Sequence, residues 1–91
     1  MSLRTAYFTR QFKKDVKLAQ KRRKDISKLK TVMEILVEGQ LLPEKYKDHR
    51  LRGEFEDYRE CHIEPDWLLI YKSNSSEIYF TRTGTHADLF G

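Results

Sequence analysis

The spacing of apolar residues changes at Gly39, and this change constrains the fold more than any other feature. Before Gly39 apolar side chains recur at helical intervals, whereas after it short aromatic and β-branched runs alternate with turn residues. A chain with helices first and a sheet later buries that sheet by packing the helices on one face. The sequence therefore predicts an α+β fold, and its 91 residues are enough for one domain, residues 1–91.

Two antiparallel helices are predicted before Gly39. Thr9 can cap the first helix, and its buried stripe would consist of Phe12, Val16 and Ala19. Asp25 can cap the second. The apolar face of that helix would consist of Ile26, Leu29, Val32, Met33 and Leu36. The basic run KRRK at residues 21–24 is the predicted turn, and so short a connection makes the helices neighbours.

One strand is predicted before the helices, at residues 3–8, and three more in the second half. These three read YRECHI, DWLLIY and EIYFTR, at residues 58–63, 66–71 and 77–82. Turns centred on Pro65–Asp66 and on residues 73–76 would join them into an antiparallel meander. The segment at residues 40–53 is predicted to be a surface loop.

Basic residues are concentrated in the predicted helices. Residues 1–30 contain eleven Lys or Arg and two Asp, whereas the remaining residues contain seven Lys or Arg and twelve Asp or Glu. Such a surface attracts polyanions, which include RNA, DNA and acidic protein segments. The alternative is a solvated helix face that binds nothing.

All three histidines lie in the second half, near the ends of predicted strands. His49 lies before the meander, His62 ends a strand, and His86 is in the tail after the last strand. If they converge at one rim of the sheet, their proton exchange near neutral pH suits general acid–base catalysis. Asp66 could orient an imidazole, and Arg82 could hold a phosphate through its fork of donors.

Structural explanations exist for the same residues. A histidine is commonly a hydrogen-bonded surface residue, Asp66 suits a Pro-Asp turn, and Trp67 is typical of a core. Cys61 faces the predicted core and would be an inert apolar filler. A metal site could be built from four side chains, but their spacings match no ligand motif: His49, His62, Asp66 and His86. No metal or other cofactor is therefore expected.

Four segments together resemble one protein family. They are KDVKLAQKR at residues 14–22, YKDHRLRG at 46–53, YRECHIEPDWLLIYK at 58–72 and RTGTHADLF at 82–90. This combination resembles the YafQ branch of the RelE/ParE-type bacterial toxins over nearly the whole chain. The resemblance implies a sheet with two N-terminal helices. It also implies a toxin of a toxin–antitoxin pair, an endoribonuclease that cuts messenger RNA in the ribosomal A site and so inhibits translation.

The resemblance places the active site on five residues, which are His49, His62, Asp66, Arg82 and His86. The RNA 2′-hydroxyl can serve as nucleophile, so the reaction requires a base, cationic donors and an acid, without a metal. We assign His86 as the acid, His49 and His62 with Asp66 as the base and its partners, and Arg82 as the phosphate clamp. Exchanging acid and base among the histidines would fit the sequence equally well.

Two further surfaces are predicted to bind RNA. The resemblance places Trp67 and Phe90 beside the site, where either could stack on a base. The basic residues predicted to dock on ribosomal RNA are Lys13, Lys14, Lys17, Lys21, Arg22 and Arg23. An acidic antitoxin could cover the basic surface or the catalytic groove.

A non-catalytic RNA- or ribosome-binding module is the alternative function, with the histidines serving structure. The cytoplasm is the expected location for either. No apolar run approaches the roughly 20 residues that a membrane helix needs. The first residues lack the apolar segment of a secretory signal, and Cys61 has no second cysteine to pair with.

Overall fold

The structure is a computed structural model that describes residues 3–91. Its elements in chain order are β1 (Thr5–Phe8), α1 (Arg10–Lys21), α2 (Ile26–Val37), η1 (Glu44–Tyr46), β2 (His49–Arg50), η2 (Gly53–Phe55), β3 (Arg59–Glu64), β4 (Trp67–Ser73), β5 (Glu77–Gly84) and α3 (His86–Phe90), where η marks a 3₁₀ turn. The predicted α+β fold is confirmed.

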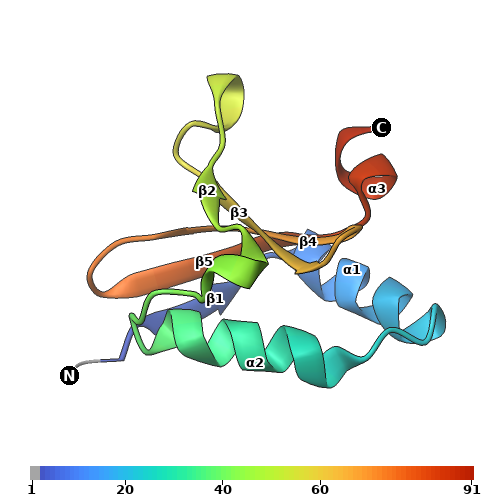
Figure 1. The fold of residues 1–91 in the computed structure, drawn as a ribbon, viewed down its shortest axis with the longest axis horizontal. Helices are drawn as coiled ribbons and strands as arrows, with labels where there is room; N and C mark the ends of the chain where they lie inside the picture. Colours follow the sequence, from blue (N-terminus) through green and yellow to red (C-terminus); the bar gives the residue numbers. More distant parts are fainter. Residues whose placement is uncertain (1–2) are drawn as a thin grey trace.

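The strands form one sheet in the order β1-β5-β4-β3-β2. Strands β3, β4 and β5 pair antiparallel in sequence, as the predicted meander requires. Strand β2 pairs antiparallel with β3 at one edge, and β1 pairs parallel with β5 at the other. In Figure 1 the helices α1 and α2 lie on one side of the sheet, whereas α3 and the segment with β2 rise on the other. The second side is the one that carries the polar site.

Side-chain caps begin both long helices, as predicted. The Thr9 hydroxyl accepts a hydrogen bond from the Phe12 N–H at 2.9 Å and donates one to the carbonyl of Thr81 at 2.7 Å, which ties the start of α1 to β5. The Asp25 carboxylate accepts from the Ser27 N–H at 3.0 Å. Gly39 follows α2 with a φ of 73°, a conformation that favours glycine.

The core lies between the helices and the sheet. The buried side chains of the predicted stripes pack against β3, β4 and β5. Along β3 the side chains alternate, so that Cys61 and Ile63 are buried toward the helices while Glu60 and His62 point to the opposite face. Burial raises the pKa of the Cys61 thiol, which agrees with its predicted role as an apolar filler.

Two segments differ from expectation. Residues 40–53 do cross the surface, but they include the edge strand β2, because Asp48 draws the chain against the sheet by accepting from the Tyr71 hydroxyl at 2.6 Å. The tail after the last strand forms helix α3, which begins with a capping box between Thr85 and Asp88. Within residues 3–91, no helix has the length and apolar character to cross a membrane.

Candidate functional site

The three histidines form a row across the polar face of the sheet. The ring centroids of His49 and His62 are 6.3 Å apart, and those of His62 and His86 are 5.9 Å apart. The rings come from β2, β3 and α3, so the sheet joins segments that are far apart in the sequence. The predicted convergence of the histidines is therefore confirmed.

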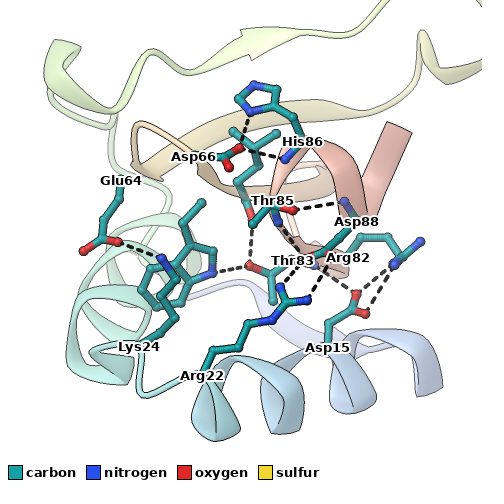
Figure 2. A network of polar contacts seen from close by, with 12 residues as sticks. Asp15, Arg22, Lys24, Glu64, Asp66, Arg82, Thr83, Thr85, His86 and Asp88 are labelled. Atoms are coloured by element: carbon teal, nitrogen blue, oxygen red, sulfur yellow. Dashed lines mark hydrogen bonds and ion pairs between the residues drawn. The ribbon is translucent and has the colours of Figure 1, made fainter. Parts of the chain in front are cut away.

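His86 is fixed at one end of the row by Asp66, in the turn between β3 and β4. One carboxylate oxygen lies 2.6 Å from His86 Nδ1 and 2.9 Å from the His86 backbone nitrogen (Figure 2). The backbone N–H and then the ring hold the pKa of Asp66 below its usual range. Because the ionised carboxylate only accepts, Nδ1 carries a proton and Nε2 is the nitrogen left to exchange one with a substrate.

The helix that carries His86 is itself tied down. The Asp88 carboxylate accepts from the Thr85 N–H at 3.0 Å, and Arg22, just after α1, donates to it at 2.6 Å (Figure 2). The Arg22 guanidinium, with Thr85, lowers the pKa of Asp88. Arg22 is also one of the predicted docking residues, and its side chain stays 43% exposed while it pairs with Asp88. It is thus a positioning contact for α3.

The Glu60 carboxylate lies between the other two histidines. Its Oε1 is 3.4 Å from His49 Nε2 and 3.6 Å from His62 Nε2, and the residue is buried. Glu60 was not among the predicted site residues, although it lies two residues before His62 in the predicted strand. Residues two apart on a strand share a face, and this was the signal that could have identified it. Glu60 is a missed member of the site.

His49 is positioned mainly through its backbone. Its Nδ1 lies 2.7 Å from the carbonyl oxygen of Lys47, a residue with a left-handed φ of 51°. The neighbouring Asp48 is bonded to Tyr71 and forms an ion pair with Arg59 at 3.2 Å. These contacts fix the two-residue strand β2 at the rim.

Arg82 lies on β5, and the structure pairs it with Asp15 of α1, not with a histidine. Its Nε donates to Asp15 at 2.7 Å and a terminal nitrogen donates at 3.3 Å, while the Thr83 N–H also bonds Asp15 at 3.1 Å (Figure 2). Asp15 is buried. Sequence reasoning missed it, although it lies on the helix stripe one turn from Phe12 and Ala19, where a carboxylate needs a partner.

The prediction that Trp67 stacks on an RNA base is wrong. Trp67 is 1% exposed, and its indole N–H donates to the Thr83 hydroxyl at 3.0 Å. The strand that starts at Trp67 directs the ring into the core, so the structural explanation holds. Phe90 at the end of α3 is 50% exposed and stays available for the predicted contact.

The remaining predicted docking residues are exposed on α1 and the turn after it, and they are Lys13, Lys14, Lys17, Lys21 and Arg23. Three lysines outside the predicted docking set line a groove with His62, and they are Lys28, Lys45 and Lys47. In the part of the chain that is described, no cluster of three or more His, Cys, Asp or Glu has the arrangement of a metal site.

Comparisons with known proteins agree with the geometry. Residues 4–91 match a protein family described as "Bacterial toxin of type II toxin-antitoxin system, YafQ". The chain is 53% identical over 92 residues to the mRNA interferase toxin YafQ of Escherichia coli strain K12, with all of both chains covered. It is 36% identical to a putative toxin YafQ of Haemophilus influenzae, with 88% of this chain and 85% of the relative covered.

Solved structures show the same fold. The toxin chain in a crystal structure of the E. coli DinJ-YafQ toxin-antitoxin complex is 52% identical and has a TM-score of 0.93, with 99% of this chain and 100% of that chain covered. A metal-bound toxin from Helicobacter pylori is 38% identical and has a TM-score of 0.89, with 98% and 100% covered. The resemblance found in the sequence is confirmed.

Proposed function

This chain belongs to the YafQ family of toxins from bacterial type II toxin–antitoxin systems, and we propose that it is a ribosome-dependent endoribonuclease that cuts messenger RNA in the ribosomal A site. The observation that carries the proposal is the row of three histidines with Asp66 at 2.6 Å from His86. Cleavage of translated message would stop protein synthesis. The expected setting is the cytoplasm.

The reaction uses the nucleophile that RNA itself carries. A base removes the proton of the 2′-hydroxyl, the oxygen attacks the adjacent phosphorus, and a 2′,3′-cyclic phosphate forms. The bond from phosphorus to the 5′-oxygen breaks, and an acid protonates that oxygen to release a 5′-hydroxyl. Two proton-exchanging groups on opposite sides of the phosphate are therefore needed, and the two ends of the histidine row supply them.

His86 is the proposed general acid, acting through the nitrogen that Asp66 leaves exposed. His49 and His62, with the Glu60 carboxylate beside both, form the proposed base. Asp66 had been grouped with this base, but its bonds to His86 make it a partner of the acid. The roles of acid and base remain exchangeable between the two ends of the row.

Arg82 is the proposed phosphate clamp, with Asp15 as its orienting partner. The Asp15 carboxylate accepts hydrogen bonds from Nε and one terminal nitrogen of Arg82. The other terminal nitrogen of the guanidinium is left to donate to a phosphate oxygen. Phe90 is the proposed stacking surface for a base of the bound message.

Two macromolecular partners follow from the family. The exposed lysines of α1, with Arg22 and Arg23, would dock on ribosomal RNA by salt-sensitive phosphate contacts. A cognate antitoxin would neutralise the toxin, as DinJ accompanies YafQ in the solved complex.

The decisive experiment is primer extension on a defined message in a translating extract, with wild type and His86→Ala compared. We expect cuts at discrete in-frame codons that require ribosomes and disappear in the variant, while the variant keeps its fold and its antitoxin binding. Naked RNA cut equally fast would contradict the dependence on ribosomes. A folded, antitoxin-free wild type that cuts nothing would favour a non-catalytic ribosome-binding module.

A further inference from the structure

A polar groove lies beside the histidine row, between the start of α2, the turn η1 and the end of β3. Its volume is about 460 Å³, within the range of small-ligand pockets. Lys28 and Thr31 line it from α2, Lys45 and Tyr46 from η1, and His62 from β3. Because His62 belongs to both, the groove opens directly onto the proposed reaction centre.

The groove exists because β2 covers only the first part of β3. Strand β2 pairs with Arg59 and Glu60 alone, so the part of β3 from His62 to Glu64 is flanked by η1 and α2 instead of a strand. The turn η1 packs against β3, and Tyr46 reaches the core. The groove is therefore bounded by α2 and η1 along the part of β3 that β2 does not cover.

The lining of the groove is cationic. Lys28 forms an ion pair with Glu64 at 2.9 Å, whereas Lys45 and Lys47 form no ion pair with any residue from 3 to 91. Three lysines thus face one carboxylate, and the excess positive charge favours an anionic ligand. The Lys45 ammonium lies 5.1 Å from the centre of the Tyr46 ring, so charge and an aromatic face are presented together.

We propose that this groove is a nucleotide subsite, which takes the message nucleotide next to the scissile phosphate. The inference rests on the proposed function. A polynucleotide that places one phosphate at His62 must continue along the protein, and the groove offers phosphate-binding ammonium groups with an aromatic ring for a base. A second groove lies at the β1 edge of the sheet. Its lining is mostly apolar, so it does not offer a similar set of ammonium groups for phosphates.

Lys45→Glu tests the subsite, with Lys30→Glu as its matched control. Both lysines are exposed, both changes alter the net charge equally, and Lys30 lies on α2 outside the groove. On ribosomes programmed with a defined message, we expect Lys45→Glu to raise KM about tenfold, as loss of a charged phosphate contact does. Lys30→Glu should change KM by less than about twofold, and thermal unfolding should be the same for both.

A second measurement uses a photo-crosslinking phenylalanine analogue in place of Tyr46. Under the proposal it crosslinks to nucleotides of the A-site codon in the message. Crosslinks to ribosomal RNA alone would overturn the subsite, because the groove would then be a docking surface.

The outcomes separate the two proposals. A wild type without cleavage overturns the proposed function itself. A cleaving wild type for which Lys45→Glu behaves like Lys30→Glu overturns the subsite only. Loss of antitoxin binding in Lys45→Glu with unchanged cleavage also overturns it, since the groove would then serve a protein partner.

Discussion

The two ends of the histidine row are held in different ways. At one end the His86 ring is bonded directly to Asp66, and its helix is capped and tied to Arg22. At the other end the His49 ring has one short contact, to the Lys47 carbonyl, and its distance to Glu60 is 3.4 Å. One ring is fixed by side-chain bonds, and the other mainly follows its backbone.

This difference indicates which end is ready before substrate arrives. A side chain whose bonds are already short loses little freedom on binding, whereas long contacts in the free protein can tighten in the complex. The Asp66–His86 end is therefore preorganised, and the end with His49, Glu60 and His62 should complete its geometry around the RNA. Substitutions at the two ends should differ in size accordingly.

Among substitutions of the carboxylates that hold the histidines, the largest effect is expected from Asp66→Ala. Removing the carboxylate frees the His86 ring and its proton assignment, so we expect cleavage in a single turnover to slow by on the order of 10²- to 10³-fold. Stability should change little because Asp66 is exposed. Quench-flow on ribosomes programmed with a defined message measures the rate.

Asp66→Asn is the matched variant, since it keeps an acceptor oxygen but loses the charge. It should fall between wild type and Asp66→Ala if both orientation and charge contribute. A rate for Asp66→Ala within about threefold of wild type would remove the basis for calling this end preorganised.

A smaller loss is expected from Glu60→Gln at the other end. The amide is similar in size, but it lacks the negative charge beside His49 and His62. We expect the single-turnover rate to fall about tenfold, because the substrate can still order these rings. A loss as large as that of Asp66→Ala would show that the two ends are equally organised in the free protein.

Local signals in the sequence predicted much of the fold. The caps at Thr9 and Asp25, the helical stripes and the Pro65–Asp66 turn all act over a few residues, and each lies where it was expected. These features depend on near neighbours, which a sequence displays directly.

What escaped prediction depends on long-range partners. Asp15 was counted as a charge because its partner Arg82 is 67 residues away, and Glu60 was missed because β2 had not been identified. Trp67 was wrongly placed beside the RNA because the sequence does not show which face of the sheet the first residue after a turn presents. In the structure it faces the core. Helix α3 had a readable signal, the Thr85 to Asp88 spacing, but is only five residues long.

Phe90 is exposed and Trp67 is buried, and both rings belong to segments next to the Asp66–His86 end of the row. Phe90→Leu should raise KM about threefold to fivefold without changing stability, since a base loses its stacking partner. Trp67→Phe removes the indole bond to Thr83 and should lower the free energy of unfolding by about 1 kcal/mol with little effect on KM. Steady-state kinetics and urea unfolding distinguish them, and the reverse pattern would restore Trp67 as a stacking residue.

The smallest expected effect is on the stability of the protein at low pH, through Asp88. The folded-state pKa of Asp88 is lowered from 3.8 by Arg22 and Thr85, so its ionised form stabilises the protein. That contribution is fully present above the unfolded-state pKa and is lost as pH falls through the lower folded-state pKa. Asp88→Asn should therefore be less stable than wild type at neutral pH. The gap in the free energy of unfolding should begin to narrow below about pH 4 and close only as pH passes the lower folded-state pKa.

Urea unfolding measured across this range tests the effect, with Asp57→Asn as a control at an exposed carboxylate that forms no ion pair within residues 3–91. Because Asp88 anchors the helix that carries His86, the variant should also lose part of its cleavage rate, whereas Asp57→Asn should not. A gap that persists unchanged at low pH would mean that the Asp88 contacts act through packing and not through charge. The anchoring of α3 would then be independent of its ion pair with Arg22, and the contrast between the two ends of the row would rest on the Asp66 bonds alone.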